Sequence, residues 1–181
     1  MRIWFNNQNV VIDKWHDKTD LLKYLDRCED GKLLFDYGQE SNELYRSISI
    51  YSDYPRKFGI GFITEYQGLL PQVLFLNDTE TVLIGTTDAI IGCDLKSKKL
   101  LFKINTGGSI FWEFLIGDNK EIIIIACEYS VFTINKQGTK LWEYTCDVLQ
   151  NYYIKDDFLF IEDMAKAKIK ININTGKVES C

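Results

Sequence analysis

Histidine and proline are scarce in this chain of 181 residues, which contains one histidine and two prolines. A single histidine, His16, excludes a His-rich metal site, and His16 itself would have to serve as the base of any serine or cysteine hydrolase. Its position at the start of a predicted helix favours an ordinary surface histidine. Pro55 and Pro71 lie between hydrophobic runs and not within them, as is typical of turns and sheet edges. We therefore expect no catalytic site, metal or cofactor.

Paired cysteines, a basic excess and long apolar runs are missing as well. The five cysteines are far apart and form no CxxC pair, so we expect free thiols and neither a disulfide scaffold nor a zinc knuckle. The net charge of −5, from 21 basic and 26 acidic residues, disfavours nucleic-acid binding. The longest aliphatic run, residues 122–126, is too short to cross a bilayer, and the first ten residues lack a signal-peptide pattern. These features predict a cytoplasmic protein without a membrane partner.

Residues 1–72 predict a small α+β lobe. The segments RIWF and NVVID flank a short polar break and indicate a β-hairpin. A helix is expected near residues 18–29, because Asp17 or Thr19 can cap it and Gly31 can follow its end. Runs of alternating or β-branched residues then predict strands.

Residues 73–181 contain three related β-meanders. Similar segments begin at Asp78, Asp118 and Asp156, at spacings of 40 and 38 residues. These spacings are typical of propeller blades and predict repeats at about 73–112, 113–150 and 151–181, packed as a single unit. Each repeat has an aliphatic strand, an alternating strand and a tight polar turn, and Gly138 and Gly176 supply the backbone freedom for two of these turns.

These repeats resemble the blades of quinoprotein-type (PQQ-repeat) β-propellers. The matching residues are Gly85, Thr86, Asp88, Asp94, Asn135, Lys140, Leu141, Trp142, Asn174, Thr175, Gly176 and Lys177, while Phe102 stands where the family has Trp. Three blades are too few to close a ring. The adjacent cysteine pair and the cofactor-facing residues of the quinoprotein dehydrogenases are missing, so the resemblance implies a scaffold without a quinone. The predicted fold is mainly β, an incomplete (half) β-propeller of about three four-stranded meanders behind a helix-bearing lobe.

An open propeller leaves strand edges that must be covered or protected. The front lobe can cover one edge. The alternating Lys166, Lys168 and Lys170 predict a charged edge strand on the other side.

Aromatic residues beside acidic ones indicate protein-binding hot spots. The predicted partner-binding residues, selected on this pattern, are Tyr51, Asp53, Tyr54, Trp112, Glu113, Tyr152, Tyr153, Asp156 and Asp157. A small acidic protein of this kind is similar in overall character to immunity proteins of bacterial contact-dependent inhibition and polymorphic toxin systems. This similarity implies a basic protein partner, a toxin domain such as a nuclease, whose active site is blocked.

Two other functions remain open from the sequence. One is a propeller-derived scaffold that joins protein partners without inhibiting them. The other is an enzyme or carbohydrate binder, because carboxylates are adjacent at Glu29-Asp30, Asp156-Asp157 and Glu162-Asp163, and such pairs can perform acid/base chemistry in a cleft. The expected role of these pairs is nevertheless in solvated turns.

Overall fold

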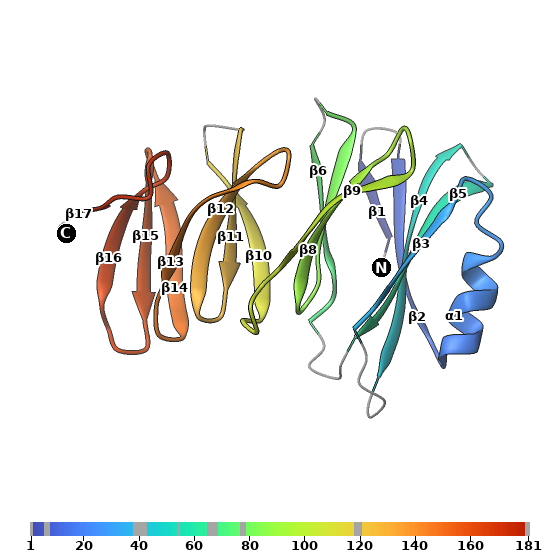
Figure 1. Cartoon of the computed structure of the whole chain (residues 1–181), viewed down its shortest axis with the longest axis horizontal. Coiled ribbons are helices and arrows are strands. Elements are labelled where there is room, and N and C mark those ends of the chain that lie inside the picture. Colours follow the sequence, from blue (N-terminus) through green and yellow to red (C-terminus); the bar gives the residue numbers. More distant parts are fainter. Residues whose placement is uncertain are drawn as a thin grey trace. The chain divides into compact units, whose positions relative to one another are not determined.

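The computed structural model describes residues 2–5, 8–37, 43–53, 55–64, 69–76, 79–117 and 121–179. It confirms a mainly β protein with one helix and several four-stranded sheets (Figure 1). The chain divides into two compact units, one formed by residues 1–68 with 95–100 and the other by residues 69–94 with 101–181. Within the described residues, no helix is long and apolar enough to cross a membrane.

Unit 1 contains a five-stranded sheet in the order β1-β2-β4-β5-β3. Its strands are β1 (Arg2–Phe5), β2 (Gln8–Trp15), β3 (Lys32–Asp36), β4 (Leu44–Asp53) and β5 (Arg56–Thr64). The predicted opening hairpin is confirmed, since β1 and β2 pair antiparallel. Strand β3 instead pairs parallel with β5, after the helix has carried the chain back along the sheet.

The helix α1 (Lys18–Leu25) packs on this sheet through its apolar side. Leu21 and Leu25 are buried with Ile63 of β5. The helix approaches closely because β5 has glycine beneath it: a Cβ atom at Gly61 would lie 2.6 Å from a methyl carbon of Leu25. Asp17 caps the helix, as expected, by accepting a hydrogen bond from the Asp20 amide at 2.9 Å.

The predicted end of the helix near residue 29 is wrong. The helix ends at Leu25 and residues 26–30 form turns, in which the amides of Arg27 and Cys28 bond to carbonyls three residues earlier. This tightening of the last turn is a common way to satisfy the final carbonyls. Gly31 then adopts φ +113°, a conformation that glycine reaches without strain.

Unit 2 contains three four-stranded sheets, each a meander in chain order. The first sheet has β6 (Gln72–Leu76), β7 (Thr81–Gly85), β8 (Ala89–Asp94) and β9 (Lys99–Asn105). The second has β10 (Phe111–Ile116), β11 (Ile122–Cys127), β12 (Ser130–Asn135) and β13 (Lys140–Thr145). The third has β14 (Leu149–Lys155), β15 (Phe158–Asp163), β16 (Lys168–Asn172) and β17 (Val178–Glu179).

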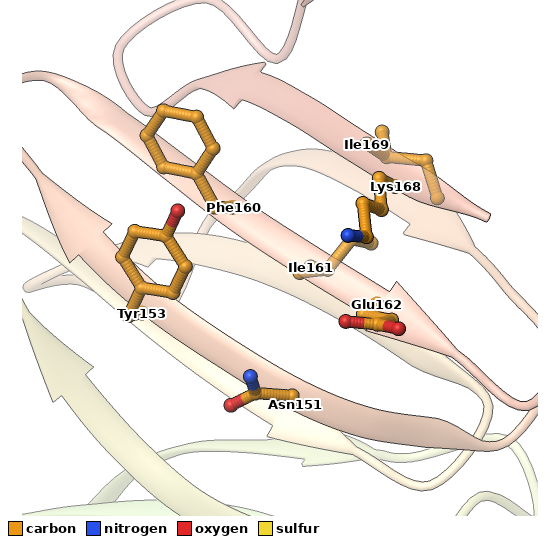
Figure 2. A pocket seen from close by; sticks show the side chains of 7 residues that line it. All are labelled: Asn151, Tyr153, Phe160, Ile161, Glu162, Lys168 and Ile169. Atoms are coloured by element: carbon orange, nitrogen blue, oxygen red, sulfur yellow. The ribbon is translucent and has the colours of Figure 1, made fainter. Parts of the chain in front are cut away.

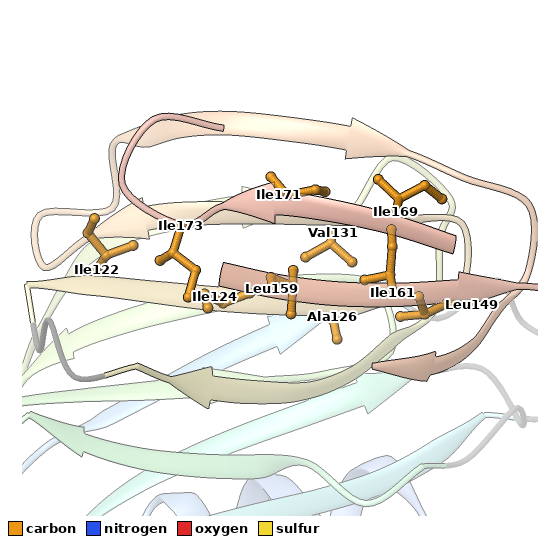
Figure 3. Close-up of a cluster of buried hydrophobic side chains, with 10 residues drawn as sticks. All are labelled: Ile122, Ile124, Ala126, Val131, Leu149, Leu159, Ile161, Ile169, Ile171 and Ile173. Atoms are coloured by element: carbon orange, nitrogen blue, oxygen red, sulfur yellow. The ribbon is translucent and has the colours of Figure 1, made fainter. Parts of the chain in front are cut away.

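The sheets of unit 2 pack face to face, and the two central strands of the middle sheet, β11 and β12, are buried on both sides. Strand β11 turns Ile123 and Ile125 toward Leu83 of the first sheet. Its alternate residues, Ile122 and Ile124, join a cluster with the third sheet (Figure 3). The ten residues of that cluster are Ile122, Ile124, Ala126, Val131, Leu149, Leu159, Ile161, Ile169, Ile171 and Ile173. A strand covered on both faces needs a continuous apolar run, which is why β11 reads IIIIAC.

A repeated contact joins each sheet to the next one at a turn glycine. Phe102 of β9 covers Gly138, where an added Cβ atom would lie 2.3 Å from the ring. Trp142 of β13 covers Gly176 in the same way, at 2.5 Å, and donates a hydrogen bond of 2.7 Å from Nε1 to the Ile173 carbonyl. The aromatic residue and the turn glycine of the repeat therefore form one inter-sheet contact.

The predicted lysine-rich edge strand is wrong in its position. Lys168 and Lys170 belong to β16, which pairs with β15 on one side and with β17 on the other. The outermost strand is β17, because the chain turns at residues 173–177 and adds a final strand of two residues. Lys170 bonds to Glu179 of that strand, with Nζ 2.9 Å from Oε2.

Candidate protein-binding surface

Five turns of unit 2 form a continuous rim at one end of its sheets. In antiparallel meanders every second turn lies at the same end. These turns are residues 86–88, 106–110, 128–129, 146–148 and 164–167. Backbone hydrogen bonds join these turns in series. The Thr106 amide donates to the Asp88 carbonyl and the Phe111 amide to the Thr87 carbonyl, and the Glu128 amide donates to the Ile110 carbonyl. Further along, the Cys146 amide donates to the Tyr129 carbonyl, the Leu149 amide to the Glu128 carbonyl and the Met164 amide to the Val148 carbonyl.

This surface, which we call the acidic rim, carries Asp88, Glu128 and Asp147, with Lys166 as the basic residue of the five turns. Tyr129 lies among the carboxylates with 43% of its surface exposed. The charge of Glu128 raises the pKa of Tyr129 above its usual value, helped by partial burial and by Asp147. Repulsion of a phenolate by two neighbouring carboxylates indicates a negative potential at the rim.

Cys146 is a half-buried residue of the rim. Burial raises the pKa of its thiol, and the charges of Asp163 and Asp147 raise it further. Asp163 is itself buried and accepts a hydrogen bond from the Ala167 amide at 3.0 Å, so it holds the turn after β15. Asp88 and Asp147 are exposed and Glu128 is half-buried, and all three stand on a turn framework that is fixed by backbone hydrogen bonds.

Three of the predicted partner-binding residues lie together between the second and third sheets. The Trp112 and Tyr152 rings are 6.5 Å apart and pack against the core cluster of Figure 3. Tyr152 Oη donates a hydrogen bond to Glu113 Oε1. Burial, this hydrogen bond and the charge of Glu113 raise the pKa of Tyr152 well above its usual value. Much of the aromatic surface of Trp112 and Tyr152 therefore packs against other residues of this chain.

Tyr153 lies on the opposite face of β14 from Tyr152. Its ring stacks on Phe160 of β15 with centroids 4.9 Å apart, and 52% of its surface is exposed. Beside this pair is an open groove of about 300 Å³ (Figure 2). Its lining residues are Asn151, Tyr153, Phe160, Ile161, Glu162, Lys168 and Ile169.

The other predicted residues are dispersed. Asp156 and Asp157 form the exposed turn between β14 and β15, where Asp156 has φ 52° and the Asp157 carbonyl accepts from the Ile173 amide. Tyr51 is half-buried in unit 1, with Lys57 Nζ 5.9 Å from its ring centre. Asp53 ends β4, and Tyr54 lies outside the described residues. Their partner-binding role stays a prediction.

The geometry also separates one candidate acid/base pair. Glu162 lies on the groove side of β15, whereas Asp163 is buried and bonded to a turn amide. Among the described residues, no group of three or more His, Cys, Asp or Glu side chains is arranged to hold a metal ion. His16 is exposed, and its Nδ1 is 3.7 Å from a carboxylate oxygen of Asp17.

The acidic rim was not selected from the sequence, although it fits the criterion that selected the other clusters. Glu128-Tyr129 stands at a turn between two apolar strands, and Asp147 stands at the next turn on the same end. Because every second turn of a meander lies at the same end, the acidic rim could have been predicted from the positions of these turns.

Comparison with solved structures supports the class of fold, an incomplete β-propeller. The chain is similar to the computationally designed Ika8 protein, with a TM-score of 0.53 and 13% identity over 99% of this chain and 59% of that one. It is also similar to BamB from Moraxella catarrhalis, with a TM-score of 0.52 and 12% identity over 81% of this chain and 50% of BamB. The chain thus spans between half and three fifths of these proteins. No protein-family model and no curated protein matches the sequence.

Proposed function

We propose that the chain is a non-enzymatic, immunity-type protein that binds a basic toxin domain, a nuclease, through the acidic rim and blocks its active site. The observation that carries this proposal is the exposed Tyr129 between the carboxylates of Glu128 and Asp147, on turns joined by backbone hydrogen bonds. The net charge of −5 points in the same direction.

The proposed mechanism is electrostatic complementarity. A nuclease holds phosphate in a cationic groove, and carboxylates on a fixed framework can occupy the positions of phosphate groups. Their charges accelerate association, and an aromatic side chain that becomes buried at the centre slows dissociation. Because Asp88 and Asp147 are exposed and Glu128 is only half-buried in the free protein, salt should weaken the complex.

The test measures binding of the full chain to a basic toxin domain encoded in a neighbouring reading frame, together with that domain's nuclease activity. The variant Glu128→Lys/Asp147→Lys should lose at least about 100-fold in affinity and its inhibition of the nuclease. The matched control Glu29→Lys/Glu80→Lys makes the same change of charge on exposed turns outside the rim. It should lose less than about threefold.

Two outcomes contradict the proposal. Equal losses in the rim variant and its control would show only a response to net charge. Affinity that does not fall between about 50 mM and about 300 mM NaCl would remove the electrostatic mechanism.

A scaffold that joins protein partners is the second candidate, and the exposed Tyr153, stacked on the half-buried Phe160, favours it. This function predicts binding without inhibition. A bound toxin domain that keeps its full nuclease activity would support the scaffold over the immunity protein.

A further inference from the structure

The side of the third sheet that carries Tyr153 has a composition unlike that of the sheet faces inside unit 2. We call it the outer face, formed by Asn151, Tyr153, Lys155, Phe158, Phe160, Glu162, Lys168, Lys170, Asn172 and Glu179, which are joined in three cross-strand rows by the pairing of β14 to β17. Strand β15 is buried only at alternate residues, whereas β11 is buried along its whole length. The outer face therefore has no sheet covering it within the chain's described residues.

Comparison with the second sheet shows which part of this face is polar. Strand pairing places Lys168 and Lys170 at the positions of Val131 and Thr133 in the second sheet. A sheet face that no other sheet covers needs such polar side chains to remain soluble. The centre is different, because Phe158 and Phe160 are retained at the positions of aliphatic residues and Tyr153 stacks beside them.

An aromatic centre inside a charged border is the composition of a protein interface. We propose that the outer face is a dimer interface, on which a second copy of this chain packs by a two-fold axis. Most homodimers have such a symmetry, and it requires that the patch be complementary to itself. In this unit, sheet faces already pack on one another, there through apolar residues.

The charges of the outer face fit this symmetry. The middle row, Tyr153, Phe160, Lys170 and Glu179, runs across the strands, with Glu162 in the row on one side and Lys155 in the row on the other. A two-fold axis along the middle row places Lys155 of the second copy over Asn151 and beside Glu162. Lys170 would face its own copy, but Glu179 neutralises it at 2.9 Å.

The size of the face sets the strength of the contact. Strands of five to seven residues, spaced as in any sheet, give a flat area of roughly 400 Å². Stable interfaces bury about 800 Å² on each partner, so the dimer should dissociate in the micromolar range.

Sedimentation of the full chain from about 1 to about 500 µM tests the proposal, because the averaged mass should rise from monomer to dimer over this range. Tyr153→Glu should give a monomer throughout. Glu162→Lys and Lys155→Glu should each weaken the dimer at least about tenfold, and the double variant Glu162→Lys/Lys155→Glu should restore it. Gln137→Lys, in an exposed turn of the second sheet, is the control and should not change the mass.

Each contrary result overturns the dimer. A constant monomer mass excludes self-association, and a dimer unaffected by Tyr153→Glu uses another surface. Failure of the double variant to restore the dimer excludes the two-fold geometry. If the chain is a monomer and Tyr153→Glu abolishes its binding to the basic toxin domain, the toxin domain and not a second copy binds the outer face. Because the sedimentation assay contains no toxin, its result is independent of the proposed function.

Discussion

Replacing Gly176 by alanine should destabilise the protein by about 2–5 kcal/mol, the sum of two costs. A non-glycine residue at the observed φ of +70° costs about 1–2 kcal/mol. The added Cβ atom would also lie 2.5 Å from the Trp142 ring, so the tryptophan must move. Overpacking of this kind costs about 1–3 kcal/mol. This overpacking cost includes part of the free energy of the hydrogen bond from Trp142 to the Ile173 carbonyl, because the ring must move.

Gly107 separates the two costs, because its φ of +69° is nearly identical and an added Cβ atom there meets no atom within 4 Å. Gly107→Ala should therefore show the backbone cost alone. Urea unfolding, followed by tryptophan fluorescence and by far-UV circular dichroism, measures both variants.

A double-mutant cycle isolates the ring contact. In a Trp142→Ala background, the cost of Gly176→Ala should fall to that of Gly107→Ala, because the ring is no longer in the way. Equal costs for Gly176→Ala and Gly107→Ala in the wild-type background would refute the inter-sheet contact as a source of stability.

Three further predictions concern the interior. Tyr152→Phe removes the hydrogen bond to Glu113 and should cost about 1 kcal/mol at neutral pH. The pKa of Tyr152 is raised in the folded protein, so the contribution of this residue to the free energy of unfolding is complete below about pH 10 and falls at higher pH. The free energy of unfolding of the Tyr152→Phe variant should therefore decrease less steeply at alkaline pH than that of the wild type. Burial raises the pKa of Cys93 and Cys127 to about 12, and iodoacetamide should label both only after unfolding. Ile124→Ala, at a fully buried site, should cost about 2–5 kcal/mol in urea unfolding.

The fold could be predicted from the sequence because its periodic features are local. The turn residues around Gly138 and Gly176, and the apolar strands between them, recur at a nearly constant spacing, and each repeat of the sequence forms one sheet. The end of α1 could not be predicted, because residues 26–30 are compatible with a helix and the turn that replaces it depends on contacts with the sheet. The last strand was missed because two residues carry no periodicity.

The candidate site was harder to predict because exposure depends on packing between sheets. Tyr152 and Tyr153 are neighbours of the same type, yet one packs against the second sheet and the other is exposed. Their alternation follows from the strand, but which face is covered does not. The acidic rim joins Asp88, Glu128 and Asp147 from three separate turns, and only the meander brings these turns to one end.

The third sheet differs from the first two in the residue that stands at the position of the inter-sheet aromatic contact. In the first two sheets, the last strand supplies the aromatic residue that covers the next turn glycine: Phe102 covers Gly138, and Trp142 covers Gly176. In β17, Glu179 occupies the corresponding position and instead bonds to Lys170 on its own sheet. A charged residue paired within its own sheet cannot make the same apolar contact. The pair of Lys170 and Glu179 therefore makes one border of the outer face polar, while the aromatic centre of this face is the part that a second copy of the chain would cover.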